Sequence, residues 1–394
     1  MGDFEEKIGL ELEFIRGSGL WRELRCIESV QGSQIYHNGK KLINFSSNDY
    51  LGLAGHHTLT EAAKHAIDRF GVGSGASRLV CGSLEVHHEL EEALARWLKA
   101  EAALVFSSGF AAAQGVISSI VGSEDVVVID KKVHASTVDA VKLSGAKLRV
   151  FKHNDLSSLE KILKWADKRN SRVLTIAESV YSMDGDSPVI EDLVDLKERY
   201  GSWLMLDEAH ALGCYGESGG GLALKSNLSE KIEIRLGTLG KSIGVAGGFI
   251  CGSKKLVDLL VNKARSFIFS TAPSPIASAA ALAGVKLVQS EEGDARRDKL
   301  WKCVSQFQKG VSSQGWPVAP ASSVILPLIL SEESNAMLAA NLLRDCGFYI
   351  PAIRYPTVPR NESRLRITLS ANHSQDEIAA LLKAFSDLIV EVNL

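Results

Sequence analysis

Short apolar runs alternate with amphipathic stretches through the middle of the chain, from about residue 100 to residue 250. The runs are rich in β-branched residues and read as strands at 104–106, 126–129, 148–151, 173–176, 203–206, 232–236 and 248–251. Helical patterns at 156–168 and 191–200 lie between them. Continuously apolar strands separated by helices predict an α/β layer with a mostly parallel sheet that is covered on both faces.

The last part of the chain has a different pattern. Helical stretches at 298–312 and 336–345 are mixed with strand-like runs at 324–326 and 365–369, and prolines interrupt the segment just before the last run. We therefore predict an N-terminal arm (1–45), a large α/β domain (46–286) and a smaller C-terminal α+β domain (287–394).

Composition excludes several classes of protein. The 394 residues carry 44 basic and 47 acidic side chains, for a net charge of −3, which is not the basic surplus of a nucleic-acid binder. No apolar run is long enough to span a membrane, and the N-terminus resembles neither a signal nor a transit peptide. The 6 cysteines are scattered without a C-x-x-C pair, as expected of reduced core thiols in the cytoplasm rather than a disulfide framework or a zinc site.

Polar residues follow the predicted strands at their carboxyl ends. Asp207-Glu-Ala-His210 comes directly after one strand, Glu178 ends its neighbour, and Thr238-Leu-Gly-Lys241 follows the next. The carboxyl ends of parallel strands meet in one crevice. A lysine there can form a Schiff base with an aldehyde, and an aspartate can hold a pyridinium nitrogen charged. The pair predicts a pyridoxal phosphate (PLP) enzyme.

A rival interpretation comes from the same residues. Gly240-Lys241-Ser242 resembles the end of a phosphate-binding loop, and Asp207-Glu-Ala-His210 spells the acidic box of helicase-type NTPases. However, Arg235 stands where that loop needs glycine, and the acidic box precedes the supposed loop. Gly71–Ala76 formally fits a dinucleotide fingerprint, but it follows a predicted helix at 59–70 instead of a strand, which favours an ordinary turn.

Three further groups would complete a PLP site. Ser107-Ser-Gly-Phe110 precedes a predicted helix, whose exposed N–H groups would favour a phosphate, although an ordinary helix cap is the simpler interpretation. His134 follows a strand and could stack on an aromatic cofactor. Arg364 and Arg366 alternate on the last strand; an arginine there could clamp a carboxylate or lie on a solvated face.

Nearly the whole chain resembles the α-oxoamine synthases, which are fold-type I PLP enzymes. The resemblance rests on an ordered series of motifs: Asn44-Phe-Ser-Ser-Asn-Asp-Tyr-Leu-Gly-Leu53, Gly73-Ser-Gly-Ala-Ser-Arg-Leu79, Phe106-Ser-Ser-Gly-Phe110, His134-Ala-Ser136, Tyr181-Ser-Met-Asp-Gly185, Asp207-Glu-Ala-His210, Thr238-Leu-Gly-Lys241, Pro356-Thr-Val-Pro359 and Arg364-Leu-Arg-Ile-Thr-Leu369. Within the family, the chain most resembles the branch that joins L-alanine to a pimeloyl thioester in biotin biosynthesis.

The resemblance implies a role for each matching residue. Lys241 would carry PLP, Asp207 would pair with the pyridinium nitrogen, and His210 would contact the phenolic oxygen. The other cofactor contacts would be the stacking ring of His134, the phosphate ligands Gly109, Phe110 and Thr238, the lining residue Ser182, and Ser270 and Thr271, which would reach the phosphate of a partner subunit. Arg366 and Asn48 would bind the amino acid, and Arg22 and Thr357 would lie near the acyl group.

The resemblance therefore implies a cytoplasmic homodimer that performs a decarboxylating condensation with PLP and no metal. Its substrates would be small: an amino acid, and an acyl group on CoA or on a carrier protein. Three alternatives stay open at this point. A sibling synthase would use glycine with acetyl-CoA or succinyl-CoA, or serine with a long-chain acyl-CoA; an NTPase would bind nucleotide; an inactive scaffold would keep the fold without turnover.

Overall fold

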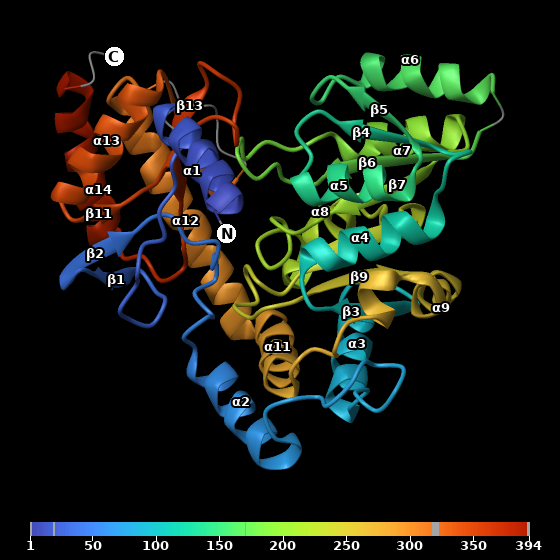
Figure 1. The fold of residues 1–394 in the computed structure, drawn as a ribbon. Helices are drawn as coiled ribbons and strands as arrows, with labels where there is room; N and C mark the ends of the chain where they lie inside the picture. The colour runs from blue at the N-terminus through green and yellow to red at the C-terminus, as the bar shows by residue number, and fades with distance from the viewer. Residues whose placement is uncertain (1, 19, 170, 317–322, 392–394) are drawn as a thin grey trace.

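A seven-stranded sheet forms the centre of the larger lobe in the computed structural model, which describes residues 2–18, 20–169, 171–316 and 323–391. The strand order is β3-β9-β8-β7-β6-β4-β5 (Figure 1). Strands β4 to β8 pair in parallel, and β9 is antiparallel to both β3 and β8. Their bounds are β3 Ala102–Phe106, β4 Val126–Asp130, β5 Lys147–Phe151, β6 Val173–Glu178, β7 Trp203–Asp207, β8 Ile234–Thr238 and β9 Gly248–Gly252.

Helices cover both faces of this sheet because apolar side chains alternate between the faces along each strand. Val127 and Ile129 pack with α4 (Gly109–Ile120), α5 (Ala135–Ser144) and α9 (Lys254–Lys263). Val126 and Val128 pack on the other face with α6 (Leu156–Asp167) and α7 (Ile190–Arg199). The smaller elements of this lobe are α8 (Gly221–Lys225), α10 (Arg265–Ile268) and the 3₁₀ turns Glu217–Gly219 and Ser229–Lys231.

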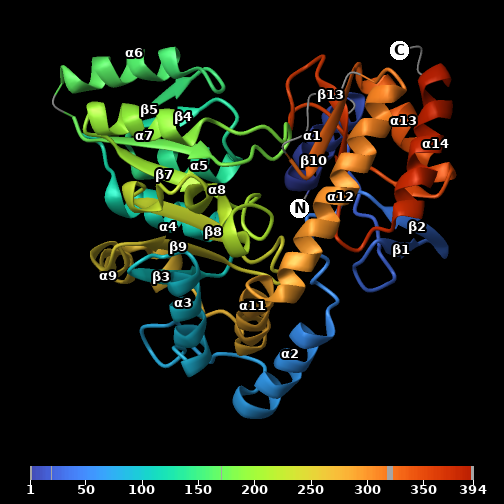
Figure 2. The same cartoon turned by 180° about the vertical axis from the view of Figure 1, so that it is seen from behind.

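Three helices lie below the sheet in Figure 1: α2 (His57–Phe70), α3 (Glu85–Trp97) and α11 (Pro275–Val288). The long helix α12 (Glu291–Ser313) then leads into the second lobe, as the rear view in Figure 2 shows. There β10 (Ile325–Ser331), β13 (Ser363–Thr368) and β12 (Ala352–Ile353) form an antiparallel sheet beside α13 (Glu333–Asp345) and α14 (Gln375–Glu391).

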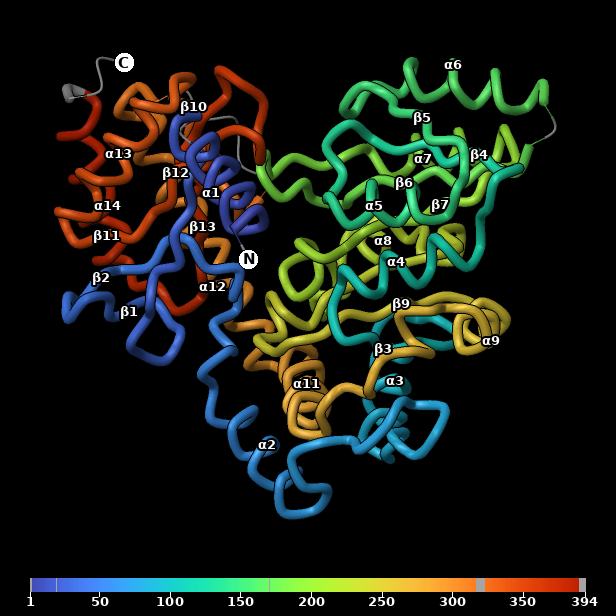
Figure 3. The backbone as a smooth tube through the Cα atoms, viewed as in Figure 1, coloured from blue at the N-terminus to red at the C-terminus, as the bar shows by residue number. Residues whose placement is uncertain are grey.

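The N-terminal segment belongs structurally with the C-terminal lobe. After α1 (Gly2–Gly17), β1 (Gln34–His37) and β2 (Lys40–Asn44) form a sheet with β11 (Phe348–Tyr349). The tube in Figure 3 shows the chain then running down to α2 and the large lobe. The domain limits at residues 45 and 286 stay predictions, but the pairing of β2 with β11 shows that residues 34–44 are no detached arm.

The fold class predicted from the pattern is confirmed, with corrections at element ends. Strand β8 runs two residues later than expected, so that Thr238 lies inside it. Helix α12 begins at Glu291 rather than at residue 298, because Ser290 caps it with a hydroxyl that accepts from the Gly293 N–H. The glycine-rich segment after residue 70 starts where α2 ends, with Gly71 as the C-cap of that helix, as expected of a turn.

Two compositional expectations can also be compared with the structure. Three of the cysteines, Cys214, Cys251 and Cys303, are buried, but Cys26, Cys81 and Cys346 are exposed, so only half of them are core thiols. Within the described ranges, no helix combines the length and the apolar content that crossing a bilayer requires.

Candidate active site

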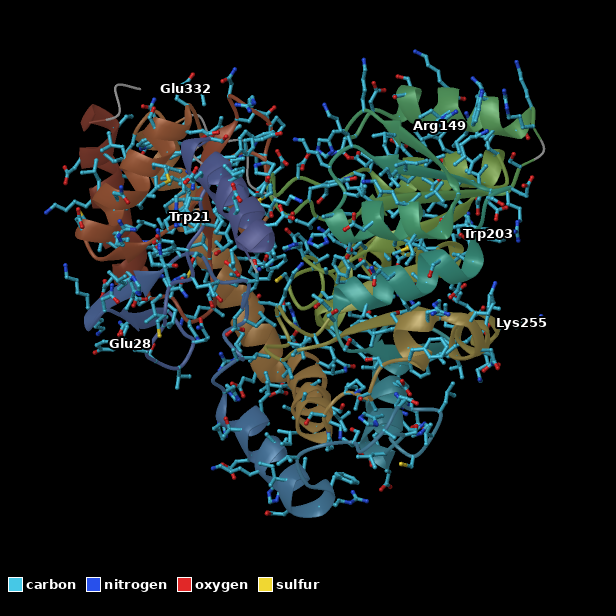
Figure 4. All side chains as sticks on the ribbon, viewed as in Figure 1. Trp21, Glu28, Arg149, Trp203, Lys255 and Glu332 are labelled. Atoms are coloured by element: carbon cyan, nitrogen blue, oxygen red, sulfur yellow. The ribbon has the colours of Figure 1, made fainter. Side chains whose placement is uncertain are left out.

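A cavity of about 180 Å³ opens at the carboxyl ends of the parallel strands. Trp203, labelled in Figure 4, is the first residue of β7, and Asp207 is its last. Most of the predicted cofactor residues line this cavity: Gly109, Phe110, His134, Asp207, His210, Thr238 and Lys241. Ser136, Glu178, Ala209 and Leu236 complete the wall.

Two carboxyl groups and one amine form the ionisable centre of the cavity. Glu178 and Asp207 are register partners at the ends of β6 and β7, and both are buried. Burial, and next the charge of Asp207, raises the pKa of Glu178 to about 8. Burial also raises the pKa of Asp207, against the opposing effects of Lys241 and of the Ala209 N–H, which donates to Asp207 Oδ1 at 2.9 Å.

Burial lowers the pKa of Lys241 to about 8, although Asp207 and Glu178 act in the opposite direction. An ammonium that loses its proton this readily supplies a neutral amine near neutral pH, which a Schiff-base lysine and a general base both need. The short Gly-flanked segment after β8 carries this lysine toward the two carboxylates.

Two histidines line the same cavity. His210 is buried, and burial lowers its pKa well below the usual range, so the ring is neutral. Its Nδ1 lies 2.6 Å from the Tyr50 hydroxyl, which leaves Nε2 for a group in the cavity. His134 caps α5 and lines the cavity; its backbone N–H donates to Glu178, and its Nδ1 lies 2.8 Å from the Ser136 hydroxyl.

The first turn of α4 offers two open amides. Ser108 occupies the later ones, because its Oγ accepts from the Ala111 N–H at 3.1 Å and its carbonyl accepts from the Ala112 N–H at 3.0 Å. Gly109 and Phe110 are the first two residues of α4, so their N–H groups have no carbonyl within the helix to donate to. Both residues line the cavity. The expected interpretation as a plain N-cap is thus true of Ser108, while the next two amides could hold an anion.

A glycine on β9 allows this strand to lie close to the first turn of α4. A Cβ on Gly248 would lie 2.4 Å from the Gly109 nitrogen, so only glycine lets β9 pass so near to α4. Thr238, opposite Gly248 in the ladder, donates its hydroxyl to the Gly247 carbonyl at 3.0 Å and accepts from the Gly240 N–H at 3.1 Å.

A second polar group, Arg366 of the C-terminal lobe, lies outside the cavity wall but near enough for its charge to lower the pKa of Lys241 and of His210. Arg366 is only 6% exposed, and it donates from Nε to the Ser182 carbonyl (2.7 Å) and from Nη2 to Asn48 Oδ1 (3.1 Å). The Tyr50 hydroxyl lies 3.2 Å from the same Asn48 oxygen and so links Arg366 to His210. The alternative of a solvated strand face is therefore wrong for this arginine.

The remaining predicted residues lie outside the cavity wall. Arg22 donates to the Thr357 hydroxyl at 3.2 Å, so the structure brings this pair together. Ser182 contributes its backbone carbonyl to Arg366. Ser270 and Thr271 are not part of the cavity wall, and Thr271 is exposed.

The sequence pattern predicts that Glu178 and Asp207 share one crevice, and both line the cavity, but the pattern gives Glu178 no role of its own. Tyr50 is a residue of the site that the sequence pattern does not predict. A carboxylate at the end of an otherwise apolar strand run was the available signal for Glu178. Tyr50 carried none, because its partner His210 lies 160 positions away.

Comparison with known proteins gives consistent matches along the full chain. The family model for aminotransferase class I and II matches residues 40–385. The 8-amino-7-oxononanoate synthase of Geobacter sulfurreducens is 42% identical over 98% of both chains, and that of Petrotoga mobilis is 41% identical over the same shares.

Among solved structures, a serine palmitoyltransferase from S. paucimobilis with bound PLP–myriocin has a TM-score of 0.92 at 27% identity, covering 100% of this chain and 98% of that one. An 8-amino-7-oxononanoate synthase from Francisella tularensis has a TM-score of 0.77 at 27% identity, covering 90% of this chain and 99% of that one.

Proposed function

The chain belongs to the aminotransferase class I and II family, and we propose that within it the protein condenses L-alanine with a pimeloyl thioester, using PLP. The products are 8-amino-7-oxononanoate, CO₂ and the thiol of CoA or of a carrier protein, a step of biotin biosynthesis. The observation that carries this proposal is the similarity to 8-amino-7-oxononanoate synthases, 42% identical over 98% of both chains.

The residues of the cavity fit PLP. Lys241 supplies an amine for the aldehyde, and Asp207 supplies a buried carboxylate for the ring nitrogen. The open amides of Gly109 and Phe110 suit the phosphate, and the ring of His134 suits the aromatic face. PLP, when bound, withdraws electrons from the α-carbon of an attached amino acid.

The chain's own groups position the substrate and move the proton. Arg366 holds the amino-acid carboxylate beside the cavity, since its guanidinium keeps N–H groups beyond those given to Ser182 and Asn48. The Lys241 amine, with its pKa lowered to about 8, takes the α-proton and returns it after CO₂ is lost. His210, neutral because it is buried, offers its second ring nitrogen to the phenolic oxygen.

We assign recognition of the acyl group to Arg22 and Thr357, which lie apart from the cavity wall. Arg22 is exposed, and its guanidinium donates to Thr357 at the border of the C-terminal lobe. A pimeloyl chain ends in a carboxylate, which an exposed arginine can pair with. Acetyl and palmitoyl groups carry no such charge. The Arg22 cation therefore favours a dicarboxylic acyl donor over the acetyl-CoA and the long-chain acyl-CoA that two sibling synthases use.

The competing activity with its own supporting observation is serine palmitoyltransferase, because the TM-score of 0.92 exceeds the value of 0.77 for an 8-amino-7-oxononanoate synthase. Release of CoA over a grid of alanine, glycine and serine against pimeloyl-, acetyl-, succinyl- and palmitoyl-CoA separates the candidates. We expect rapid release only with alanine and pimeloyl-CoA. Rapid release only with glycine or with serine would refute this assignment, and no release with any pair or with a pimeloyl-carrier protein would favour an inactive scaffold.

We also propose a homodimer whose partner completes each site. Ser270 and Thr271 match phosphate-binding positions of the family but do not line the cavity of their own chain. Exposed apolar side chains lie in the neighbouring segments: Val72 (72%), Val80 (78%) and Phe269 (71%). Backbone bonding of Ala272 to Ala76 at 3.0 Å joins these segments into one surface. Sedimentation of the PLP-loaded protein tests the dimer. A cytoplasmic location also stays a prediction.

A further inference from the structure

A tight turn at residues 181–186 connects the large sheet to the C-terminal lobe. It follows β6 and is closed by backbone bonds from Gly185 N–H to the Tyr181 carbonyl (2.8 Å) and from Tyr181 N–H to the Asp186 carbonyl (3.0 Å). Figure 1 shows this segment after β6 reaching across to the lobe that contains β13. Gly185 packs so closely that a Cβ there would lie 2.2 Å from the Ile325 carbonyl oxygen.

The lobe side of the turn holds both arginines of β13. The Ser182 carbonyl accepts from Arg366 Nε at 2.7 Å. The Met183 carbonyl and the Asp184 carboxylate accept from Arg364 Nη1 at 3.1 and 2.9 Å. The position of the turn therefore determines the direction in which the Arg366 guanidinium points.

The sheet side of the same turn is held by one imidazole. His153 Nδ1 lies 2.9 Å from Asp130 Oδ1 at the buried end of β4, and its Nε2 lies 2.7 Å from Asp186 Oδ2 in the turn. A neutral imidazole can donate from only one nitrogen, so both contacts are hydrogen bonds only when the ring is protonated. One charged ring thus joins two carboxylates of different segments.

We propose that His153 is a positioning residue for amino-acid binding: as an imidazolium it ties the 181–186 turn to β4, and through the Ser182 carbonyl it keeps Arg366 aimed at the substrate carboxylate. The inference rests on the proposed function only for the role of Arg366. His153 itself is not part of the cavity wall.

The groups around the ring are consistent with a charged state. Burial by itself would lower the pKa of His153, but the hydrogen bonds that the ring donates to the Asp130 and Asp186 carboxylates outweigh it and raise the pKa to about 9. Tyr181 meets the ring edge-on, with centroids 4.5 Å apart, and stays neutral because burial raises its own pKa. The Asn154 amide adds a donor to the same Asp186 oxygen at 2.9 Å.

The test compares His153→Asn with the wild type, both loaded with PLP. Titration with L-alanine, followed by cofactor absorbance, gives an amino-acid Kd at each pH. We expect the variant to bind alanine about tenfold more weakly near pH 7.5, the effect of one misdirected charge-assisted hydrogen bond. The PLP affinity and the KM for the acyl thioester should change by less than about twofold, since neither involves Arg366.

The pH dependence separates a charged positioning role from plain packing. The ratio of the two Kd values should fall toward one as the pH passes about 9, where wild-type His153 loses its proton. Titration of the alanine amine affects both proteins and cancels in the ratio. Asp186→Asn should move this fall to lower pH, because one of the two carboxylates that raise the pKa is gone. His65→Asn, at an exposed histidine of α2, is the matched control.

Equal Kd values near pH 7.5 would overturn the proposal, and so would a ratio that is independent of pH. Weakened binding of PLP together with a lower melting temperature would show a folding defect and overturn it as well. If the wild type binds another amino acid, the proposed function fails while the same comparison with that amino acid still tests His153. If the wild type binds no amino acid, both proposals fail.

Discussion

Replacing Arg366 with lysine tests the site most directly, because the change keeps the charge and alters only the donors. A guanidinium has five N–H groups. One, on Nε, goes to the Ser182 carbonyl at 2.7 Å, and one on Nη2 goes to Asn48 at 3.1 Å. The remaining three, on Nη1 and Nη2, form a flat edge that can meet both oxygens of a carboxylate.

A lysine cannot serve all of these partners. Its ammonium has three donors around one atom, so holding Ser182 and Asn48 leaves a single donor for the substrate. The variant therefore loses about one charge-assisted hydrogen bond, worth roughly 1.5–3 kcal/mol. That loss corresponds to an amino-acid Kd that is about 10 to 150 times higher. Arg366 is only 6% exposed, so bulk water cannot readily replace the missing donor.

The assay is titration of the PLP-loaded variant with L-alanine, alongside the KM for the acyl thioester. The thioester KM should change little. L-Alaninamide, which lacks the carboxylate, should bind the wild type and the variant with similar affinity. Arg199→Lys, at an exposed arginine of α7, is the matched control and should behave like the wild type. An unchanged alanine Kd in Arg366→Lys would refute the assignment of Arg366 as the carboxylate clamp.

Two further substitutions probe the cofactor. Asp207→Asn keeps an acceptor for the Ala209 N–H but removes the negative charge, so PLP should remain bound while kcat falls by at least about 100-fold; a kcat within tenfold of the wild type would contradict the role of Asp207. Gly248→Ala places a Cβ 2.4 Å from the Gly109 nitrogen and should weaken PLP affinity by displacing the first turn of α4, whereas Gly122→Ala, with open space around it, should not. Equilibrium dialysis measures the PLP affinity of the two glycine variants. Equal affinities would contradict the proposal that the first turn of α4 binds the cofactor phosphate.

Much of the fold follows from local patterns. The apolar runs of the central strands indicated a covered parallel sheet, and the sheet order β8-β7-β6-β4-β5 has this character. Local chemistry also identified Lys241, Asp207 and the start of α4, because strand ends, glycines and helix caps are visible in a few neighbouring residues. Element ends were less certain: the polar first turn of α12 concealed its start at Glu291.

Local patterns therefore predicted the fold class and the residues that gather at the carboxyl ends of the strands. The contacts of Arg366 with Asn48, 318 positions away, and of His210 with Tyr50, 160 positions away, became visible only in the three-dimensional fold. It also made Glu178 a register partner of Asp207 and tied the 181–186 turn to His153. Such contacts depend on strand order, register and lobe packing. A local pattern of polar and apolar residues shows which side chains are buried, but not which distant side chain each one meets.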